Sequence, residues 1–194
     1  MRIEVVKNFI DQDLCEQMNS WVDLGVDNKW LDMGISRVSN QDFQSVENRF
    51  TSRFYGHRFV YPDFVLDLSQ QIRKFCGIDN FPLIEGHGRN GIVVSCTLSG
   101  GDVYKHRDSY APFQNKSTLR CNIMTRAAES GGKLFVGNNQ VDIEVGDLHC
   151  YLASDFDHYV TTVEGNTSRV LWMFGAHVPF DDWESGKIKL SNSK

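Results

Sequence analysis

The sequence contains no apolar run that approaches the ~18 residues needed to cross a bilayer, and its first residues do not follow the basic-then-apolar pattern of a secretory signal. It also has no long run of charge of one sign: the net charge is −5, and acidic and basic residues are interspersed. This balance disfavours nucleic acid or an anionic membrane as the main partner. We therefore expect a cytoplasmic protein with no nucleic-acid or membrane partner, and the sequence leaves its oligomeric state open.

Cysteine is scarce and irregularly spaced. The residues are Cys15, Cys76, Cys96, Cys121 and Cys150, an odd number in which no pair has C-x-x-C spacing. Each lies in an apolar or strand-like segment, and disulfides are rare in cytoplasmic proteins. We therefore expect reduced, mostly buried thiols that pack as small apolar side chains.

Internal repeats, low-complexity segments and an interdomain linker are also absent. A chain of 194 residues is long enough to bury one core, so we expect a single domain over 1–194. The expected secondary structure changes along the chain. An N-terminal strand, helices and a lid loop are expected in 1–82, a β-rich catalytic core in 83–180 and a C-terminal tail in 181–194.

Two helices are predicted in the N-terminal part. The first follows Asp11, a suitable N-cap, and ends at Gly25. Its buried stripe comprises Leu14, Met18, Trp21 and Val22. The second begins near Pro62 and ends before Gly77. Its inner face includes Leu66, Ile72 and Phe75. Residues 27–53 lack a clear period and indicate a long loop with short strands, a segment typical of functional lids.

Strands are predicted from Ile3 to Phe9 and in a series that starts at Ile92. Turns that contain glycine separate the later strands, at 99–102, 130–132, 137–139, 146–147 and 165–166. Short strands with such turns are typical of an antiparallel sandwich or barrel. We therefore expect a mainly β (α+β) fold in which the N-terminal helices pack on one sheet from outside.

The segment His106-Arg107-Asp108 carries the first candidate chemistry. On a strand, positions i and i+2 point to one face, so His106 and Asp108 can offer a nitrogen and an oxygen to one ion. Two histidines and one carboxylate form the facial triad of non-haem iron(II) oxygenases, which leaves positions open for a co-substrate and oxygen. An isolated H-x-D is a weak signal, and taken singly it is more typical of a surface strand.

The second imidazole comes from His158, at the start of a strand that Gly165-Asn166 is predicted to join to a return strand over 168–174. For an even-numbered turn, His158 and Arg169 share a face, about four residues or roughly 13 Å of backbone apart. The two-pronged guanidinium of Arg169 would then hold the far carboxylate of a five-carbon diacid whose other end binds the metal. An odd-numbered turn would place Arg169 on the other face.

From about Ile92 to Pro179 the sequence resembles the 2-oxoglutarate/iron(II) oxygenase superfamily, in its prolyl-4-hydroxylase-like branch. The family motifs stand here in order as His106-Arg107-Asp108, Gly131-Gly132-Lys133-Leu134-Phe135, Gly146-Asp147-Leu148, His158-Tyr159-Val160 and Arg169. Each motif is weak alone, but five in the right order and spacing are specific. The resemblance covers a little under half of the chain and implies a double-stranded β-helix (jelly-roll) core.

The resemblance implies that His106, Asp108 and His158 bind Fe(II) and that Arg169 binds the distal carboxylate of 2-oxoglutarate. The co-substrates are then 2-oxoglutarate, which is decarboxylated to succinate, and O2, and the family leaves room for ascorbate. Halogenating relatives lack the carboxylate of the triad. Because Asp108 is present, the resemblance implies hydroxylation rather than halogenation.

Two further residues are candidates for binding 2-oxoglutarate. Tyr104 shares the face of His106 by alternation, although many relatives have their aromatic residue where this chain has Val103. Asn122 faces the cavity if the polar residues of its strand do. The remaining histidines lack a spaced carboxylate partner and are expected to be structural or exposed, with the loop residue His87 as a candidate for the cavity rim. They are His57, His87, His149 and His177.

These observations predict a 2-oxoglutarate- and Fe(II)-dependent dioxygenase that hydroxylates an organic substrate. A prolyl residue of a peptide or protein is the default of this branch, and a free amino acid or small metabolite is the nearest alternative, because a fold does not fix a substrate. Two other classes stay open. One is a jelly-roll module that binds a metal or ligand without oxygenase activity, and the other is a hydrolase that uses the triad for zinc.

Overall fold

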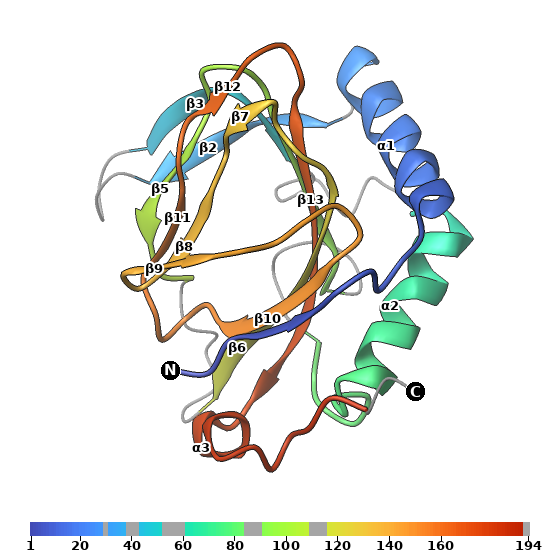
Figure 1. The fold of residues 1–194 in the computed structure, drawn as a ribbon, viewed down its shortest axis with the longest axis vertical. Coiled ribbons are helices and arrows are strands. Elements are labelled where there is room, and N and C mark those ends of the chain that lie inside the picture. The colour runs from blue at the N-terminus through green and yellow to red at the C-terminus, as the bar shows by residue number, and fades with distance from the viewer. Residues whose placement is uncertain (29–30, 38–42, 52–60, 84–90, 109–115, 192–194) are drawn as a thin grey trace.

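The computed structural model describes residues 1–28, 31–37, 43–51, 61–83, 91–108 and 116–191. Within them, two antiparallel sheets face each other, and two long helices cover the outer side of the larger sheet (Figure 1). None of the helices in these ranges has the length and apolar character needed to span a bilayer. The mainly β prediction, with helices against one sheet, is confirmed.

The major sheet contains, in spatial order, β1 (Glu4–Val6), β10 (Leu148–Leu152), β6 (Ser117–Arg126), β13 (Arg169–Val178), β4 (Val93–Thr97), β3 (Phe43–Thr51) and β2 (Asp32–Arg37). The minor sheet contains β5 (Val103–His106), β11 (His158–Val160), β8 (Leu134–Val136) and β9 (Asn139–Val141). A short pair joins β12 (Val163–Glu164) to β7 (Ser130–Gly131). Strands β1, β2 and β3 precede residue 82, yet they extend the same sheet as the strands of the expected core.

Helix α1 (Gln12–Asp27) begins as predicted, because the Asp11 carboxylate accepts a hydrogen bond of 2.9 Å from the backbone nitrogen of Leu14. It ends two residues beyond Gly25, which is itself buried. Helix α2 (Asp63–Phe75) follows Pro62 and ends before Gly77, also as predicted. Its buried face is Val65, Leu68, Ser69 and Ile72, so only Ile72 of the predicted inner face is fully buried.

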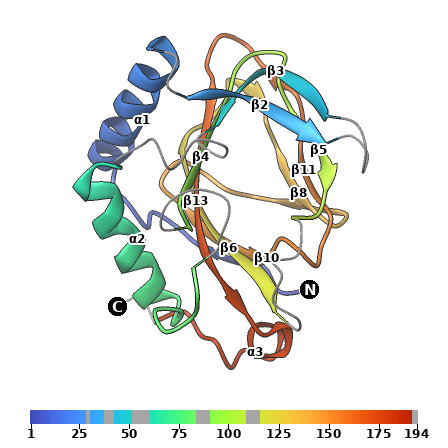
Figure 2. The same ribbon diagram turned by 180° about the vertical axis from the view of Figure 1, so that it is seen from behind.

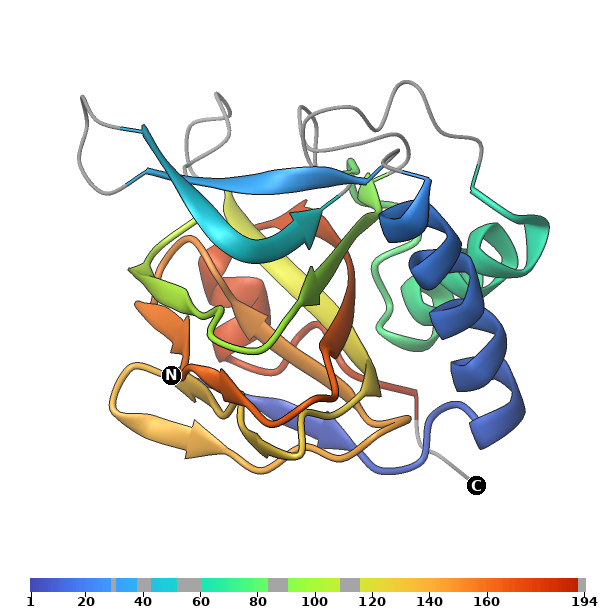
Figure 3. The same cartoon turned by 90° about the horizontal axis from the view of Figure 1, so that it is seen from above.

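The larger hydrophobic core lies between these helices and the major sheet. Trp172 of β13 is its largest buried side chain, and the ring of Trp21 from α1 lies 5.4 Å from it, centroid to centroid. A smaller apolar cluster lies between the two sheets and includes Val103, Val136 and Val160. Seen from above, the helices lie along one side of the molecule and the minor sheet along the other (Figure 3). The apolar residues of the central strands therefore point to the helices, and their alternate residues point into the space between the sheets.

The chain path differs from the prediction in one segment. Residues 27–53 are not mainly loop, because β2 and β3 pair over much of this segment and form one edge of the major sheet (Figure 2). The C-terminal tail is docked: it contains the short helix α3 (Phe180–Glu184), and the Arg2 guanidinium donates to the carbonyl oxygens of Trp183 and Ile188 at 2.7 and 2.8 Å. The described part of the tail thereby contacts the segment that precedes the first strand.

Candidate metal centre

Two imidazoles and one carboxylate meet between the sheets. Oδ1 of Asp108 lies 3.6 Å from Nε2 of His106 and 3.8 Å from Nε2 of His158, and the two rings are 4.3 Å apart between centroids. The ligand atoms of all three residues lie within 4.8 Å of one another. The three residues that sequence analysis selected as metal ligands therefore converge on one point.

The backbone fixes both imidazoles in the orientation that a metal requires. Nδ1 of His106 lies 2.8 Å from the carbonyl oxygen of Tyr104, and Nδ1 of His158 lies 3.2 Å from that of Phe156. Each carbonyl accepts the Nδ1 proton, which leaves the Nε2 lone pair directed at the centre. Strand pairing supports this arrangement, since His106 of β5 lies directly opposite His158 of β11.

Burial keeps His158 in its neutral, metal-binding form. The side chain is 7% exposed, and burial, together with the nearby His106, lowers the pKa of His158 to about 4. The carboxylate of Asp108 acts in the opposite direction but does not outweigh burial. At neutral pH a cation would therefore bind His158 without displacing a proton.

Asp108 follows β5 rather than belonging to it, and it has a buried partner. Its backbone nitrogen donates to the carbonyl oxygen of Ala153 at 2.9 Å, and Nε of Arg120 donates to Oδ2 at 2.8 Å. Arg120 is 5% exposed and lies on β6 of the opposite sheet. Sequence analysis missed this partner, because only the facing of the two sheets brings the guanidinium to the carboxylate.

The triad opens onto a cavity with an empty volume of about 640 Å³, its open mouth included. Its charged and metal-ligating lining residues are His106, Asp108, His158, Arg49, Arg120 and Arg169. Three arginines against one carboxylate give the cavity a positive potential before any metal binds. Such a site is suited to a dianionic ligand. Arg49, whose Nε donates to Oγ of Ser95 at 2.9 Å, gave no recognisable sequence signal.

Arg169 is a buried cation whose hydrogen-bond donors are only partly used by the described residues. Its side chain is 2% exposed, and Nε and one Nη have no hydrogen-bond partner among the described residues. Burial lowers the pKa of Arg169 to about 10, which still leaves it charged at neutral pH. Gly132 leaves room for this side chain, because a Cβ there would lie 3.1 Å from Cδ of Arg169. Unpaired buried donors of this kind indicate a site for an anion.

The hairpin that sequence analysis used to place Arg169 beside His158 does not exist. Arg169 belongs to β13, which pairs with β4 and β6, whereas His158 belongs to β11, which pairs with β5 and β8. The chain crosses from one sheet to the other around 165–168, so the two residues lie on facing sheets. Both nevertheless line the same cavity. The two side chains are therefore brought together by the facing of the sheets and not by a hairpin.

Asn122 lines the cavity, so the condition on which its prediction depended, that the polar residues of its strand face inward, is met at this position. Arg120 and Asn122 of β6 point to the cavity, while Cys121 points to the helices. Nδ2 of Asn122 lies 3.4 Å from Nε2 of His149, and its Oδ1 has no partner in the described part of the chain. Tyr151 of β10 also lines the cavity, and burial raises its pKa. The Tyr151 hydroxyl and the Asn122 amide lie within hydrogen-bonding reach of each other, and Oδ1 of Asn122 is the acceptor that remains for a ligand.

Tyr104 is not among the residues that line the cavity, although its ring lies beside that of His106, as alternation predicts. Pairing of β5 with β11 matches His106 to His158 and Val103 to Val160, so β5 contains one extra residue at a bulge. Val103 and His106 therefore line the cavity, and Tyr104 stacks on the imidazole of His106, with 5.0 Å between ring centroids. Its contact with a co-substrate stays a prediction. His149 and His177 are buried, and His57 and His87 lie outside the described residues.

No protein-family model and no curated protein matches the sequence. Solved structures do match. A viral collagen prolyl hydroxylase from Paramecium bursaria Chlorella virus-1, in complex with 2-oxoglutarate, shares 11% identity at a TM-score of 0.63, over 92% of this chain and 97% of that one. A prolyl-4-hydroxylase from Pseudomonas putida shares 13% identity at a TM-score of 0.62, over 90% and 92%.

A third similar structure is HygX from Streptomyces hygroscopicus with nickel and 2-oxoglutarate bound, which shares 10% identity at a TM-score of 0.59, over 99% of this chain and 91% of that one. At these identities the likeness establishes the fold. The chain therefore has the fold of these enzymes, prolyl hydroxylases among them, as the resemblance of the sequence motifs implies.

Proposed function

We propose that the protein is a 2-oxoglutarate- and Fe(II)-dependent dioxygenase that hydroxylates an organic substrate. One observation carries the proposal: His106, Asp108 and His158 converge on a cavity that also holds the buried guanidinium of Arg169, whose Nε and one Nη have no partner among the described residues. The shared fold with 2-oxoglutarate-bound enzymes supports it, and so does the two-sheet arrangement, which we interpret as a double-stranded β-helix.

The donor set suits Fe(II). Two neutral imidazole nitrogens and one carboxylate oxygen are the ligands of the facial triad, which leaves coordination positions free. Bound iron supplies the oxidation chemistry, in which 2-oxoglutarate and O2 give succinate, carbon dioxide and a hydroxylated product. Arg120 contributes by holding Oδ2 of Asp108, so that Oδ1 stays directed at the imidazoles.

Arg169 suits the distal carboxylate of 2-oxoglutarate. Its free donors match the two oxygens of a carboxylate, and the surrounding burial strengthens the attraction by excluding water. Asn122 and Tyr151 lie on neighbouring strands of the same sheet and are suited to hydrogen-bond the bound co-substrate. Tyr104 acts on His106 through ring stacking in this proposal, and the family leaves room for ascorbate as a reductant.

A prolyl residue of a peptide or protein is the proposed substrate. A similar structure from Trichoplax adhaerens is a prolyl hydroxylase in complex with a peptide fragment of hypoxia inducible factor, at 12% identity and a TM-score of 0.62. A small-molecule substrate is the second candidate, since HygX has also been solved with hygromycin B bound, at 11% identity and a TM-score of 0.58. The five free cysteines fit a reducing compartment such as the cytoplasm.

Anaerobic titration of the metal-free protein with Fe(II) and then 2-oxoglutarate tests the reaction class. A weak charge-transfer absorption near ~500 nm is expected from the chelated complex, and it requires both additions. A module that binds a metal without oxygenase activity predicts no such band. A zinc hydrolase predicts turnover without oxygen and no requirement for Arg169, so activity in anaerobic buffer would overturn the proposal.

Substrate class is tested by succinate formation above the uncoupled rate. A panel of proline-containing peptides and a panel of free amino acids and small metabolites are compared at equal 2-oxoglutarate and Fe(II). Stimulation by the peptides alone, with a mass increase of one oxygen on a prolyl residue, supports the first candidate. Stimulation confined to the small molecules favours the second.

A further inference from the structure

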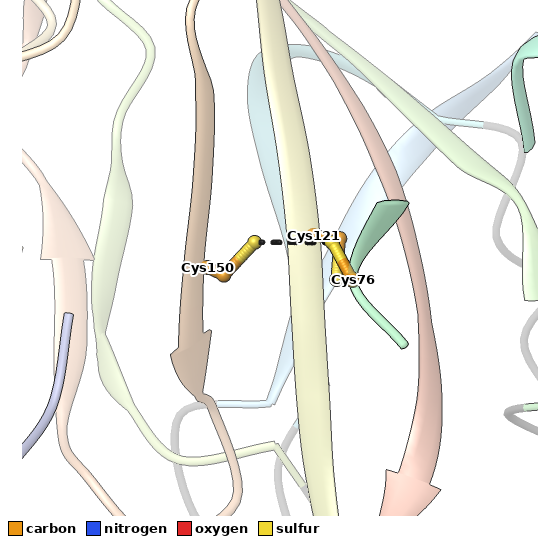
Figure 4. Close-up of side chains that lie close together, drawn as sticks. All are labelled: Cys76, Cys121 and Cys150. Atoms are coloured by element: carbon orange, nitrogen blue, oxygen red, sulfur yellow. Dashed lines mark hydrogen bonds between the residues drawn. The ribbon is translucent and has the colours of Figure 1, made fainter. Parts of the chain in front are cut away.

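Three cysteines that are distant in sequence meet on the helix side of the major sheet, away from the cavity. Cys121 of β6 and Cys150 of β10 are paired directly across neighbouring strands, and Cys76 is the C-cap of α2. Figure 4 shows the three side chains converging from these elements. All three have 0% exposure and belong to the larger hydrophobic core.

The sulfur atoms are close but not bonded. Sγ of Cys76 lies 3.9 Å from Sγ of Cys150, all three sulfurs lie within 4.8 Å of one another, and all are free thiols. A cation with metal–sulfur bonds of about 2.3 Å holds three coplanar sulfurs about 4.0 Å apart. The cluster therefore has the dimensions of a three-coordinate thiolate site without rearrangement of the strands.

The guanidinium of Arg73 lies close enough to the cluster to act on its charge. The two other thiols, Cys121 first, lie within hydrogen-bonding reach of Cys76. The hydrogen bond with Cys150 lowers the pKa of Cys121, but the one with Cys76 and burial outweigh it and hold that pKa well above its usual value; the positive charge of Arg73 acts to lower it. Nη1 of Arg73 is buried and has no hydrogen-bond partner among the described residues. The guanidinium therefore offsets part of the negative charge that three thiolates would concentrate.

The donor set points to a particular cation. Sulfur ligands select soft ions, chiefly Cu(I) and Zn(II), and structural zinc sites almost always have four ligands in a tetrahedron. In the described part of the chain the cluster contains three cysteines and no fourth ligand. A dry, three-sulfur site fits Cu(I), which accepts trigonal coordination, better than zinc.

We propose that Cys76, Cys121 and Cys150 form a binding site for one Cu(I) ion, separate from the triad in the cavity. The ion reaches the sulfurs when the last turn of α2 opens, because Cys76 caps that turn and Gly77 follows it in the left-handed conformation (φ +63°). Binding ties α2 to two strands of the major sheet and stabilises the fold independently of the proposed oxygenase reaction.

Cys15 provides the matched comparison. It is also fully buried in the same core, but it lies on α1 outside the cluster. Burial raises the pKa of Cys15 to about 11, as expected for a thiol that acts only as a small apolar side chain. The three cysteines of the cluster thus differ from Cys15 in lying close to two further thiols, and not in how deeply they are buried.

The test is an anaerobic titration of the reduced, metal-free full-length protein with Cu(I) against a chromophoric Cu(I) chelator. Wild type, Cys15→Ser and His158→Ala are expected to bind one equivalent, and Cys121→Ala and Cys150→Ala to bind at least 100-fold more weakly. His158→Ala removes a triad ligand, so binding by this variant locates the ion away from the cavity. Equal binding by wild type and the cluster variants would overturn the proposal.

X-ray absorption of Cu(I)-loaded His158→Ala gives a second readout that does not depend on whether the cluster variants fold. Three sulfur neighbours at about 2.3 Å are expected, with no nitrogen or oxygen in the first shell. Nitrogen ligands, or displacement of Cu(I) by an equal concentration of Zn(II), would refute the assignment. The Fe(II)/2-oxoglutarate absorption of folded cluster variants should be unchanged, so the outcome here is distinguishable from that for the proposed function.

Discussion

Nε of Arg120 donates a hydrogen bond of 2.8 Å to Oδ2 of Asp108, whose other oxygen faces the imidazoles of His106 and His158. The bond joins facing sheets, since Arg120 belongs to β6 and Asp108 directly follows β5. It orients the carboxylate and compensates its charge in a buried setting. The first two predictions follow from this pair.

Replacing Arg120 by Met should weaken Fe(II) binding by about 10- to 100-fold, the usual effect of losing a partner of a metal ligand. The measurement is calorimetric titration of the metal-free protein with Fe(II) under anaerobic conditions. Arg126→Met is the matched control, because Arg126 lies on the same strand but pairs with Asp23. Equal affinities for the two variants would show that Arg120 does not orient the triad.

Replacing Asp108 by Ala should abolish 2-oxoglutarate turnover and also destabilise the metal-free protein. The substitution leaves Arg120 as a buried, unpaired charge, which costs on the order of 3 kcal/mol of unfolding free energy. The double variant Asp108→Ala/Arg120→Met should recover much of that stability in urea unfolding but none of the activity. Recovery of turnover in the double variant would remove Asp108 from the metal site.

Arg169→Met should raise the 2-oxoglutarate concentration needed for half-maximal succinate formation by about 30-fold or more, corresponding to a loss of about 2 kcal/mol of binding free energy. In the absence of ligand the variant should be at least as stable as wild type, because a buried cation with unpaired donors is replaced by an apolar side chain. The shift in melting temperature that 2-oxoglutarate causes should disappear.

Arg169→Lys gives the graded control for this prediction. A lysine keeps the charge but loses the two-pronged contact, so its requirement for 2-oxoglutarate should lie between those of wild type and Arg169→Met. Unchanged co-substrate affinity in the Met variant would refute the assigned role of Arg169. A large loss of unfolding free energy without ligand would instead indicate a structural role.

Acidification should destabilise the metal-free protein over a defined range. Burial lowers the pKa of His149 to about 3 and that of His158 to about 4, from a usual value of 6.5. Between these values and pH 6.5 the unfolded chain binds more protons than the folded one, so stability is lost as pH falls from about 6.5 toward 4. Each histidine contributes a slope of up to about 1.4 kcal/mol per pH unit.

Urea unfolding at pH 7, 6 and 5 measures this slope. His149→Gln keeps a polar group near Asn122 but removes the titration, so the slope between pH 6 and 5 should decrease. Adding Fe(II) should lessen the destabilisation at pH 5, because the metal competes with the proton for His158. A slope that is identical in wild type and His149→Gln would contradict the prediction.

Several features were predictable because they depend on neighbours along the chain. Asp11 caps α1 through a backbone nitrogen three residues ahead, and Pro62 and Gly77 bound α2 by their own backbone preferences. Along β6 the strand period places Asn122 on the same face as Arg120, and the structure shows that this face lines the cavity. In β5 the rings of Tyr104 and His106 stack as the period predicts, but a bulge set by the pairing with β11 also brings Val103 to the cavity, which the period does not predict.

The amino-acid sequence by itself determined which ligand types are present and in what order, and so the triad and its arginine. Which strands pair was decided only in the tertiary structure, and the predicted hairpin between β11 and β13 is wrong because the chain changes sheets there. Contacts across facing sheets, or between a helix end and a sheet, cannot be predicted from residues that are neighbours in the sequence. Arg120 therefore meets Asp108, and Cys76 meets Cys121 and Cys150, through side-chain burial summed over the whole fold.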